Sequence, residues 1–369
     1  MGRAFIVILA ALSLVIVACN APTGGASPTP TKTADIKRSK LDIAYSAFVD
    51  QDVHHVTSRK ALEAALDAAK TEIKAEGGNA DAATPSFQDT EDPQTADFNK
   101  FAQAIAGMTA TISQPSADKI ADAAISGMIK SSPDCHTYYV DANGGVHNSS
   151  GLAPKGSGPV MPNGGTSLGG PDQAGLQGKV LPGGIVYITF HEFSVTGTYK
   201  ITDAVKAMLD KAVAQGAKAW LFDLRGNIGG NGADLMASWF LNGEPTLSVV
   251  VKTGNAGTSS GNKDLRLPQA YQLPIAIVQN DRGGSAPEVF TASLKESKRA
   301  TVVGAKSVGC LGATSPTHMT DGAELAVAVQ EFTGAVTGTK YNNNGITPDV
   351  AADDPTAVDK ALELLKQKI

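Results

Sequence analysis

The chain after Pro182 alternates between strand-like and helix-like hydrophobic patterns, and this alternation constrains its fold more than any other feature. Short apolar runs are typical of buried strands, and amphipathic runs of ten or more residues are typical of helices. The predicted strands cover residues 185–190, 219–224, 246–252, 274–279, 300–304 and 325–329, and the predicted helices cover 201–215, 233–241, 286–296 and 358–368. Such alternation indicates an α/β domain, which we place at residues 183–369.

The segment before this domain spaces its apolar residues three and four positions apart. Leu62 and Leu66 fall on one helical face, and Phe101 and Ile105 fall on another. This spacing is typical of amphipathic helices. We therefore expect a helical cap domain over residues 36–140.

Residues 141–182 join these two regions and are dense in Gly, Pro, Ser and Asn. Their apolar content is too low for a module with a core of its own, and the composition is typical of a loop. The sequence therefore predicts a Gly/Pro-rich linker at residues 141–182.

The first residues have the composition of a targeting segment rather than of a folded domain. A basic start at Arg3 precedes an apolar run that ends in small residues before Cys19. This pattern predicts a lipoprotein signal peptide at residues 1–19, with Cys19 becoming the lipid-modified first residue. Residues 20–35 are rich in Pro, Thr, Gly, Ser and Ala, which is typical of a flexible tether. We expect an extracytoplasmic protein anchored to the cell membrane.

The charge balance argues against nucleic acid as a partner. The formal net charge is −5, from 31 basic and 36 acidic residues of mixed order. Phosphate binding requires a basic stripe, and the sequence has none. Two cysteines remain once Cys19 carries lipid, namely Cys135 and Cys310. Outside the cytosol such a pair can be oxidised.

A glycine-rich turn follows the predicted strand at residues 219–224. The string from Phe222 to Gly230 reads Phe-Asp-Leu-Arg-Gly-Asn-Ile-Gly-Gly. Glycines there allow backbone N–H groups to approach a carbonyl oxygen closely, as an oxyanion hole requires. The alternative is an ordinary turn between strand and helix in which the glycines serve the backbone alone.

Ser285 stands after a Gly-Gly pair and just before Pro287, a residue favoured in the first turn of a helix. Its hydroxyl would lie at the positive end of the predicted helix at 286–296, a suitable place for a nucleophile. Glu288 follows three residues later, so the same residues also fit a capping box. The two roles are compatible, because Glu288 can order the turn that presents Ser285.

His136 lies at the exit of the predicted cap, within the string Pro-Asp-Cys-His-Thr-Tyr. An imidazole with an ordinary pKa near 6.5 suits the role of general base toward a serine hydroxyl. The other five histidines stand in less distinctive settings. A solvated or structural histidine remains the alternative for His136.

Taken together, these strings resemble the C-terminal processing, or tail-specific, family of serine peptidases and their tricorn-core relatives. The resemblance runs from Pro133 to Asp349. Its motifs are Asp-x-His-Thr at 134–137, the strand at 185–190, the turn at 223–230, Ser-Ala-Pro-Glu at 285–288, Arg-Ala at 299–300, Asp-Gly at 321–322 and Gly-Ile-Thr-Pro-Asp at 345–349. The family's fold implies a crotonase-like catalytic core with a helical cap.

The resemblance implies that Ser285 is the nucleophile. It also implies that the N–H of Ala286 and that of Gly229 or Gly230 form the oxyanion hole. The tail-specific branch uses a lysine as base, but Cys310 stands at that position here. A Ser–Lys dyad would therefore require Lys306 to reach the site.

In the tricorn-like branch the base is a histidine from the cap, and His136 matches its position. We therefore expect a Ser285–His136 pair, with Glu288 ordering the nucleophile's turn. Asn342 replaces the glutamate of that branch, so it can orient a partner only by hydrogen bonding. The resemblance also leads us to hypothesise a Cys135–Cys310 disulfide, because both positions would border Ser285.

The family's processing enzymes carry a PDZ domain between cap and core, but the corresponding interval here is too short for one. The resemblance thus predicts an exported serine endopeptidase that hydrolyses peptides or unfolded proteins. It implies no metal and no organic cofactor. The alternative is a catalytically silent envelope lipoprotein that keeps the cleft for binding peptides or proteins. The oligomeric state is left open by the sequence.

Overall fold

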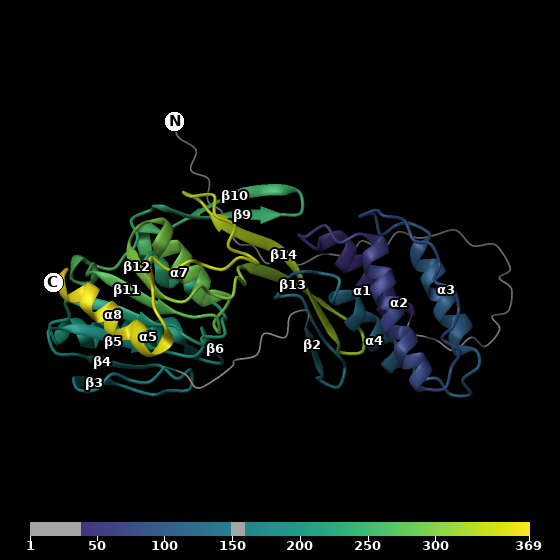
Figure 1. Ribbon diagram of the computed structural model, residues 1–369, viewed down its shortest axis with the longest axis horizontal. Coiled ribbons are helices and arrows are strands. Elements are labelled where there is room, and N and C mark those ends of the chain that lie inside the picture. Colours follow the sequence, from purple (N-terminus) through teal and green to yellow (C-terminus); the bar gives the residue numbers. More distant parts are fainter. Residues whose placement is uncertain (1–37, 149–158) are drawn as a thin grey trace. The chain divides into compact units, whose positions relative to one another are not determined.

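A computed structural model describes residues 38–148 and 159–369 (Figure 1). The predicted signal peptide, the predicted tether and Cys19 lie outside the described residues. Within the described part of the chain, no helix has both the length and the apolar character needed to cross a membrane.

Among the described residues, four α-helices lie in the N-terminal region and four in the C-terminal region. They are α1 (Arg38–Gln51), α2 (Ser58–Ala75), α3 (Asp97–Thr109), α4 (Ala117–Ile129), α5 (Ile201–Ala214), α6 (Ala233–Ser238), α7 (Ala286–Glu296) and α8 (Asp354–Lys366). Two short 3₁₀ helices, η1 (Lys263–Leu265) and η2 (Gln269–Tyr271), lie in the loop before β11 (Ile275–Gln279).

A seven-stranded sheet forms the centre of the C-terminal region (Figure 1). Its order is β15 (Val350–Ala351), β12 (Ala300–Gly304), β11, β8 (Ala219–Asp223), β5 (Ile185–Thr189), β4 (Gln177–Val180) and β3 (Thr166–Gly169). The pairs from β15 to β5 are parallel, and β4 and β3 add an antiparallel edge.

Helices cover both faces of this sheet. Successive side chains of a strand point to opposite faces, so one strand contributes to a core on each face. Trp220 and Phe222 of β8 join a core with α5, α6 and α7. Ala219 and Leu221 of the same strand instead join a core with α8. Continuous apolar strands are what a parallel sheet buried on two faces requires. The result is the expected mixed α/β domain.

A second, antiparallel sheet borders the N-terminal helices. Its order is β10 (Gly254–Ser260), β9 (Pro245–Val251), β14 (Glu324–Gly334), β1 (Tyr138–Val140) and β2 (Val146–Asn148), with β13 (Gly312–His318) also paired to β14. Leu325 and Val327 of β14 and Tyr139 of β1 are buried in one core with α1 to α4. A two-stranded ribbon of β6 (Val195–Thr196) and β7 (Tyr199–Lys200) completes the elements.

The prediction of a linker without secondary structure at residues 141–182 is wrong at both ends of that segment, where strands form. The segment contributes β2 to the antiparallel sheet, and β3 and β4 to the edge of the larger sheet. All three strands are short; β2 and β3 are largely exposed edge strands, and β4 is only partly buried. An edge strand needs little apolar content because one side faces solvent, so hydrophobic patterning did not reveal it.

Candidate active site

Ser285 is the first candidate residue, and its backbone is unusual. It precedes α7 with φ 69° and ψ −120°, a conformation that side-chain-bearing residues rarely adopt. Strain of this kind is found where a sharp turn from strand to helix presents a nucleophilic serine. Here the strand is β11 and the helix is α7, so the local fold places the Ser285 hydroxyl at the positive end of the helix.

Glu288 orders the turn that carries Ser285. Its carboxylate is buried and accepts hydrogen bonds from the N–H of Gly309 and Cys310, each at 2.7 Å, and from the hydroxyl of Ser307 at 2.5 Å. It also accepts from the N–H of Ser285 at 3.2 Å. Burial raises the pKa of Glu288 despite these bonds. The structure thus gives Glu288 the role of clamping the 307–310 loop against the start of α7.

His136 has a carboxylate partner two residues before it. Asp134 Oδ1 lies 3.2 Å from Nδ1 of His136 and accepts a 2.6 Å hydrogen bond from the His136 backbone N–H. This pairing favours the tautomer with the proton on Nδ1 and leaves Nε2 as the basic nitrogen. Asp134 is fully buried, which alone would raise its pKa, but His136 and His54 outweigh burial and hold the pKa of Asp134 well below its usual range.

A wider polar network fixes Asp134. His54 Nε2 lies 2.8 Å from Asp134 Oδ2, and the side-chain amide of Asn342 donates to the same oxygen at 3.0 Å. That amide also donates to Glu331 at 2.9 Å, and Glu331 lies 3.4 Å from Nδ1 of His54. Asn342 therefore binds Asp134, and it reaches the candidate base His136 only through Asp134.

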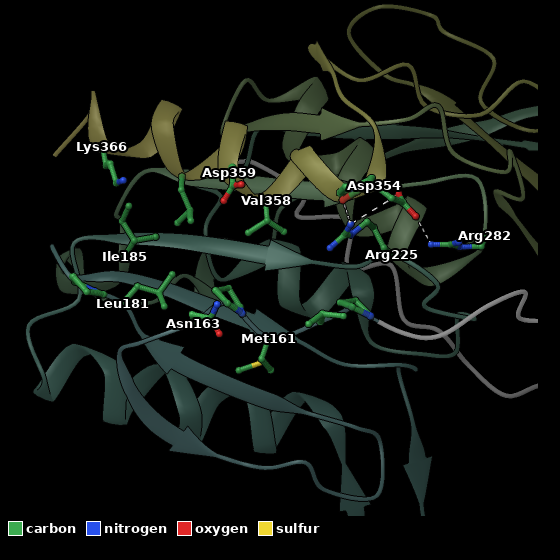
Figure 2. A pocket seen from close by; sticks show the side chains of 16 residues that line it. Met161, Asn163, Leu181, Ile185, Arg225, Arg282, Asp354, Val358, Asp359 and Lys366 are labelled. Atoms are coloured by element: carbon green, nitrogen blue, oxygen red, sulfur yellow. Dashed lines mark hydrogen bonds and ion pairs between the residues drawn. The ribbon is translucent and has the colours of Figure 1, made fainter.

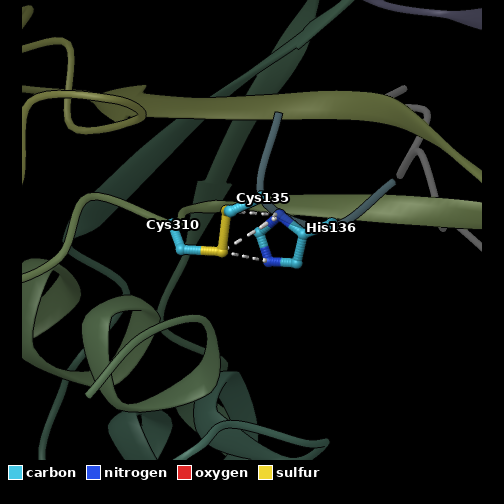
Figure 3. Close-up of side chains that lie close together, drawn as sticks. All are labelled: Cys135, His136 and Cys310. Atoms are coloured by element: carbon cyan, nitrogen blue, oxygen red, sulfur yellow. Dashed lines mark hydrogen bonds between the residues drawn. A yellow bond between two sulfur atoms is a disulfide. The ribbon is translucent and has the colours of Figure 1, made fainter. Parts of the chain in front are cut away.

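Cys135 and Cys310 form a disulfide with a Cα–Cα distance of 5.8 Å, the pairing that we hypothesised from the sequence (Figure 3). The imidazole of His136 lies against this bond. Its Nε2 is 3.3 Å from Cys310 Sγ, and its Nδ1 is 3.4 Å from Cys135 Sγ. A bonded sulfur carries no proton, so this contact leaves Nε2 able to accept one.

The glycine turn lies directly against Ser285. A side chain at Gly229 would place its Cβ 2.8 Å from the Ser285 Cβ, and one at Gly230 would lie 2.1 Å from the carbonyl oxygen of Phe193. Both glycines have φ above 100°. The Gly229 N–H donates to Asn227 Oδ1 at 3.0 Å, so the N–H groups of Gly230 and Ala286 are the better candidates for an oxyanion hole.

One cavity of about 290 Å³ brings the main candidates together. Ser285, His136 and the Cys135–Cys310 disulfide all line it. The remaining lining residues are Tyr138, Val146, Asn148, Ile228, Arg282, Gly284 and Thr314. No hydrogen bond joins the Ser285 hydroxyl to the His136 ring. Such bonds are often long without substrate and tighten when it binds.

Lys306 does not belong to this cavity. Its side chain is exposed, and it is absent from the residues that line the wall around Ser285. Cys310, at the position of the family lysine, is committed to the disulfide. The geometry therefore favours His136 over Lys306 as the base.

A larger cavity of about 760 Å³ lies beside α8 (Figure 2). Arg225, Asp354 and Arg282 are joined by ion pairs at one end of it. Arg225 also binds the buried Asp223, so the arginine of the glycine-rich string has a structural role. Neither Ser285 nor His136 lines this cavity, and only Arg282 lines both. We therefore place the chemistry in the smaller cavity.

Comparison with known proteins narrows the interpretation of this geometry. Residues 184–352 match the model of peptidase family S41. We call these matched residues the S41 domain. Ser285, Glu288, the glycine turn and Cys310 lie inside the S41 domain, whereas Asp134, Cys135 and His136 lie before it.

Two curated relatives align with about the same part of the chain. Carboxy-terminal processing protease CtpA of Bacillus subtilis (strain 168) is 29% identical over 171 residues, which cover 46% of this chain and 35% of that protein. A CtpA-like serine protease of Staphylococcus aureus (strain COL) is 30% identical over 175 residues, which cover 47% and 34%. The chain thus spans about a third of the length of these relatives.

The likeness to a solved structure extends beyond the S41 domain. A crystal structure of a candidate peptidase from Parabacteroides merdae ATCC 43184 has a TM-score of 0.50, with 17% identity. It covers 84% of this chain and 97% of that one. At this identity the likeness concerns the fold alone.

Sequence reasoning missed two residues of the site. Asp134 carries a usable signal, because a carboxylate two positions before the candidate base stands in the Asp-x-His-Thr string. His54 was placed among the less distinctive histidines, and the structure shows that it binds Asp134 directly. No local pattern could have revealed His54, because its partner lies 80 residues away in the chain.

Proposed function

We propose that this chain is an exported serine endopeptidase that hydrolyses peptides or unfolded proteins through an acyl-enzyme on Ser285. The observation that carries the proposal is the strained Ser285 at the start of α7, in one cavity with His136. The S41 domain supports the same reaction class. We further infer that the S41 domain is a crotonase-like core and that α1 to α4 act as its cap.

In the proposed reaction, the Ser285 oxygen attacks the carbonyl carbon of the scissile bond while its proton passes to Nε2 of His136. Asp134 accepts a hydrogen bond from the Nδ1 proton, which stays on the ring, and stabilises the imidazolium that forms. The N–H groups of Gly230 and Ala286 would bind the oxyanion, and each such donor lowers the barrier by about 3 kcal/mol. His136 then protonates the leaving amine, and water hydrolyses the acyl-enzyme by the same steps.

Asp134 supplies the carboxylate that the sequence lacks at position 342. An orienting carboxylate is important in a catalytic triad because it sets the tautomer and stabilises the charged imidazole. Asn342 donates to Asp134, so it holds the orienting group in place rather than replacing it. This arrangement accounts for an amide where tricorn-like relatives have a glutamate.

The decisive experiment uses a fluorophosphonate probe and casein cleavage on wild type, Ser285→Ala, His136→Ala and Lys306→Ala. We expect covalent labelling and cleavage by the wild type, neither by Ser285→Ala, and a loss of at least about 10²-fold for His136→Ala. Lys306→Ala is the matched control and should keep full activity. Loss of activity in Lys306→Ala would instead favour a lysine base.

A second candidate function is binding without catalysis. It is favoured by the missing family lysine at Cys310 and by the lack of a hydrogen bond between Ser285 and His136. In that case the cavity would bind peptides or envelope proteins, and the wild type would be neither labelled by the probe nor able to cleave casein. A folded but unlabelled wild type would therefore move the assignment to a peptide-binding lipoprotein.

We also propose that the protein is held outside the cytosol by lipid on Cys19. Support comes from the apolar run before Cys19 and from the Cys135–Cys310 disulfide, a bond that persists in oxidising compartments. Incorporation of labelled fatty acid by the wild type but not by Cys19→Ser would test the anchor. Equal labelling of both would contradict it.

A further inference from the structure

Three metal-ligating side chains meet at one wall of the active-site cavity. The Sγ atoms of Cys135 and Cys310 and a ring nitrogen of His136 all lie within 4.8 Å of one another (Figure 3). Two sulfurs and one imidazole form a donor set that suits Zn²⁺, which takes thiolate and imidazole ligands in tetrahedral geometry. In the oxidised protein the disulfide occupies both sulfurs.

One distance between these atoms is already close to that of a zinc site. With ordinary Zn–S and Zn–N bond lengths, a tetrahedral site separates sulfur and nitrogen by roughly 3.5 Å. Nε2 lies 3.3 Å from Cys310 Sγ, which matches this separation. Cys135 Sγ lies 3.4 Å from Nδ1, the nitrogen that faces Asp134, so Cys135 must turn toward Nε2 to become a ligand. Once the S–S bond is broken, rotation of the two cysteine side chains would separate the sulfurs.

The surroundings of His136 match those of a metal-ligating imidazole. A ligating histidine usually donates its other ring N–H to a carboxylate, which fixes the ring and strengthens the ligand. Asp134 lies 3.2 Å from Nδ1 and is itself held by His54 and Asn342. Nε2 is therefore the nitrogen that faces the metal position.

The site is also accessible. Cys135, His136 and Cys310 line the same cavity of about 290 Å³, so an ion could enter without unfolding of the chain. The space in front of them leaves room for a fourth ligand such as water.

We propose that the Cys135–Cys310 disulfide masks a Zn²⁺ site formed by both cysteine sulfurs and Nε2 of His136. A dithiol reductant supplies two electrons and two protons to the bond and is itself oxidised to a disulfide. The two resulting thiols lose their protons when Zn²⁺ binds, so binding releases two protons to solvent. Nε2 would then donate its lone pair to the metal.

Zinc binding has a consequence for the proposed peptidase, and this part rests on the proposed function. An Nε2 atom that binds Zn²⁺ cannot accept the Ser285 proton. The reduced, zinc-loaded protein would be inactive, and a chelator would restore activity. The oxidised protein would be insensitive to zinc.

The test uses the full chain with Cys19→Ser, in which Cys135 and Cys310 are the only cysteines. Co²⁺ serves as the spectroscopic probe for the zinc site. We expect the reduced protein to bind one Co²⁺ per chain, with thiolate-to-cobalt charge-transfer absorption and the visible bands of a tetrahedral ion. Zn²⁺ should displace the Co²⁺, and the oxidised protein should show neither feature.

Two variants in the same Cys19→Ser chain separate the ligand role of His136 from general effects. His136→Ala should weaken binding by the reduced protein at least tenfold. His318→Ala removes an exposed histidine and should leave binding unchanged. Equal binding by His136→Ala and the parent chain would overturn the assignment of the third ligand.

Reduction could loosen the fold, so circular dichroism is recorded before metal is added. Zn²⁺ should then raise the thermal midpoint of the reduced protein, because a ligand that binds the folded state stabilises it. An unchanged midpoint, or reduced protein without charge-transfer absorption, would overturn the proposal. These readouts do not depend on peptidase activity, so they stay informative if the proposed function fails.

Discussion

At the scale of single residues, Ser285 links backbone strain to chemistry. Its positive φ places the side chain at the start of α7, and a sparsely populated backbone conformation of this kind costs a residue with a Cβ about 1–3 kcal/mol. The surrounding contacts enforce it, since the Ser285 N–H donates to the Cys310 carbonyl at 2.8 Å. A glycine would hold the same turn without strain, but it would lack the hydroxyl.

This strain concerns two variants that both lack the hydroxyl, and it predicts that glycine is more stable than alanine at position 285, the reverse of the usual order in a helix. Ser285→Gly should have a free energy of unfolding about 1 kcal/mol higher than Ser285→Ala, because glycine tolerates φ 69°. Urea unfolding of the two purified variants measures the difference. The control pair is Ser126→Gly and Ser126→Ala within α4, where alanine should be the more stable. If the alanine variant were the more stable at both positions, Ser285 would be unstrained.

At the scale of elements, hydrophobic periodicity predicted most helices and strands of the core. The predicted helix at 286–296 and strand at 300–304 agree with α7 and β12. The strands β3 and β10 escaped prediction because they are polar and exposed, and β13 because it is polar and only half-buried. Their pairing comes from hydrogen bonds to neighbouring strands. Strand pairing of this kind depends on a partner distant in the chain, which local pattern does not encode.

Helix packing in the N-terminal region gives a prediction at this scale. Gly127 of α4 faces α2 so closely that a Cβ would lie 2.4 Å from the Ala64 carbonyl oxygen and 2.6 Å from the Ala68 Cβ. Gly127→Ala should therefore lower the free energy of unfolding by about 1–3 kcal/mol, since the helices must move apart.

The matched control for this prediction is Gly107 in α3, where no atom would contact an added Cβ. Gly107→Ala should raise the free energy of unfolding by up to about 1 kcal/mol, because alanine restricts the unfolded chain and favours the helix. Thermal or urea unfolding measures both. A Gly127→Ala protein as stable as Gly107→Ala would contradict the close packing of α2 and α4.

At the scale of the whole molecule, distant segments meet around His136. The disulfide joins residues 175 positions apart, and a crosslink of that span contributes about 5 kcal/mol in the chain-entropy model, whose mechanism is disputed. Beside it, His54, Asp134, Glu331 and Asn342 form one network from segments far apart in sequence, in which Asp134 and Asn342 are buried. This network couples the stability of the fold to the ionisation of the site.

The network predicts how stability changes with pH. Burial alone would lower the pKa of His54, but Asp134, Asp52 and Glu331 outweigh it and raise the pKa above its ordinary 6.5. The stability that protonated His54 contributes is therefore complete below pH 6.5 and is lost as the pH rises through the raised value. Asp134 behaves oppositely, because its lowered pKa contributes stability that is lost only below its ordinary 3.8.

We expect His54→Gln to reduce the loss of stability above pH 6.5 relative to wild type. The raised pKa of Asp52, caused first by burial, adds a separate loss that begins above 3.8 and remains in the variant. Urea unfolding at a series of pH values measures both slopes, with His318→Gln as an exposed control. Parallel profiles for wild type and His54→Gln would refute a charged His54 in the folded protein.

The sequence by itself determined the α/β alternation, the helical segments before it and the serine at the start of a helix. These features depend on side-chain periodicity and on turn residues, which act over a few neighbouring positions. Only the tertiary structure decided that Asp134 contacts Nδ1 of His136, that Lys306 lies outside the cavity and that Asn342 donates a hydrogen bond to Asp134. The reason is physical: Asn342 and Asp134 are 208 positions apart, and folding of the intervening chain brings them together.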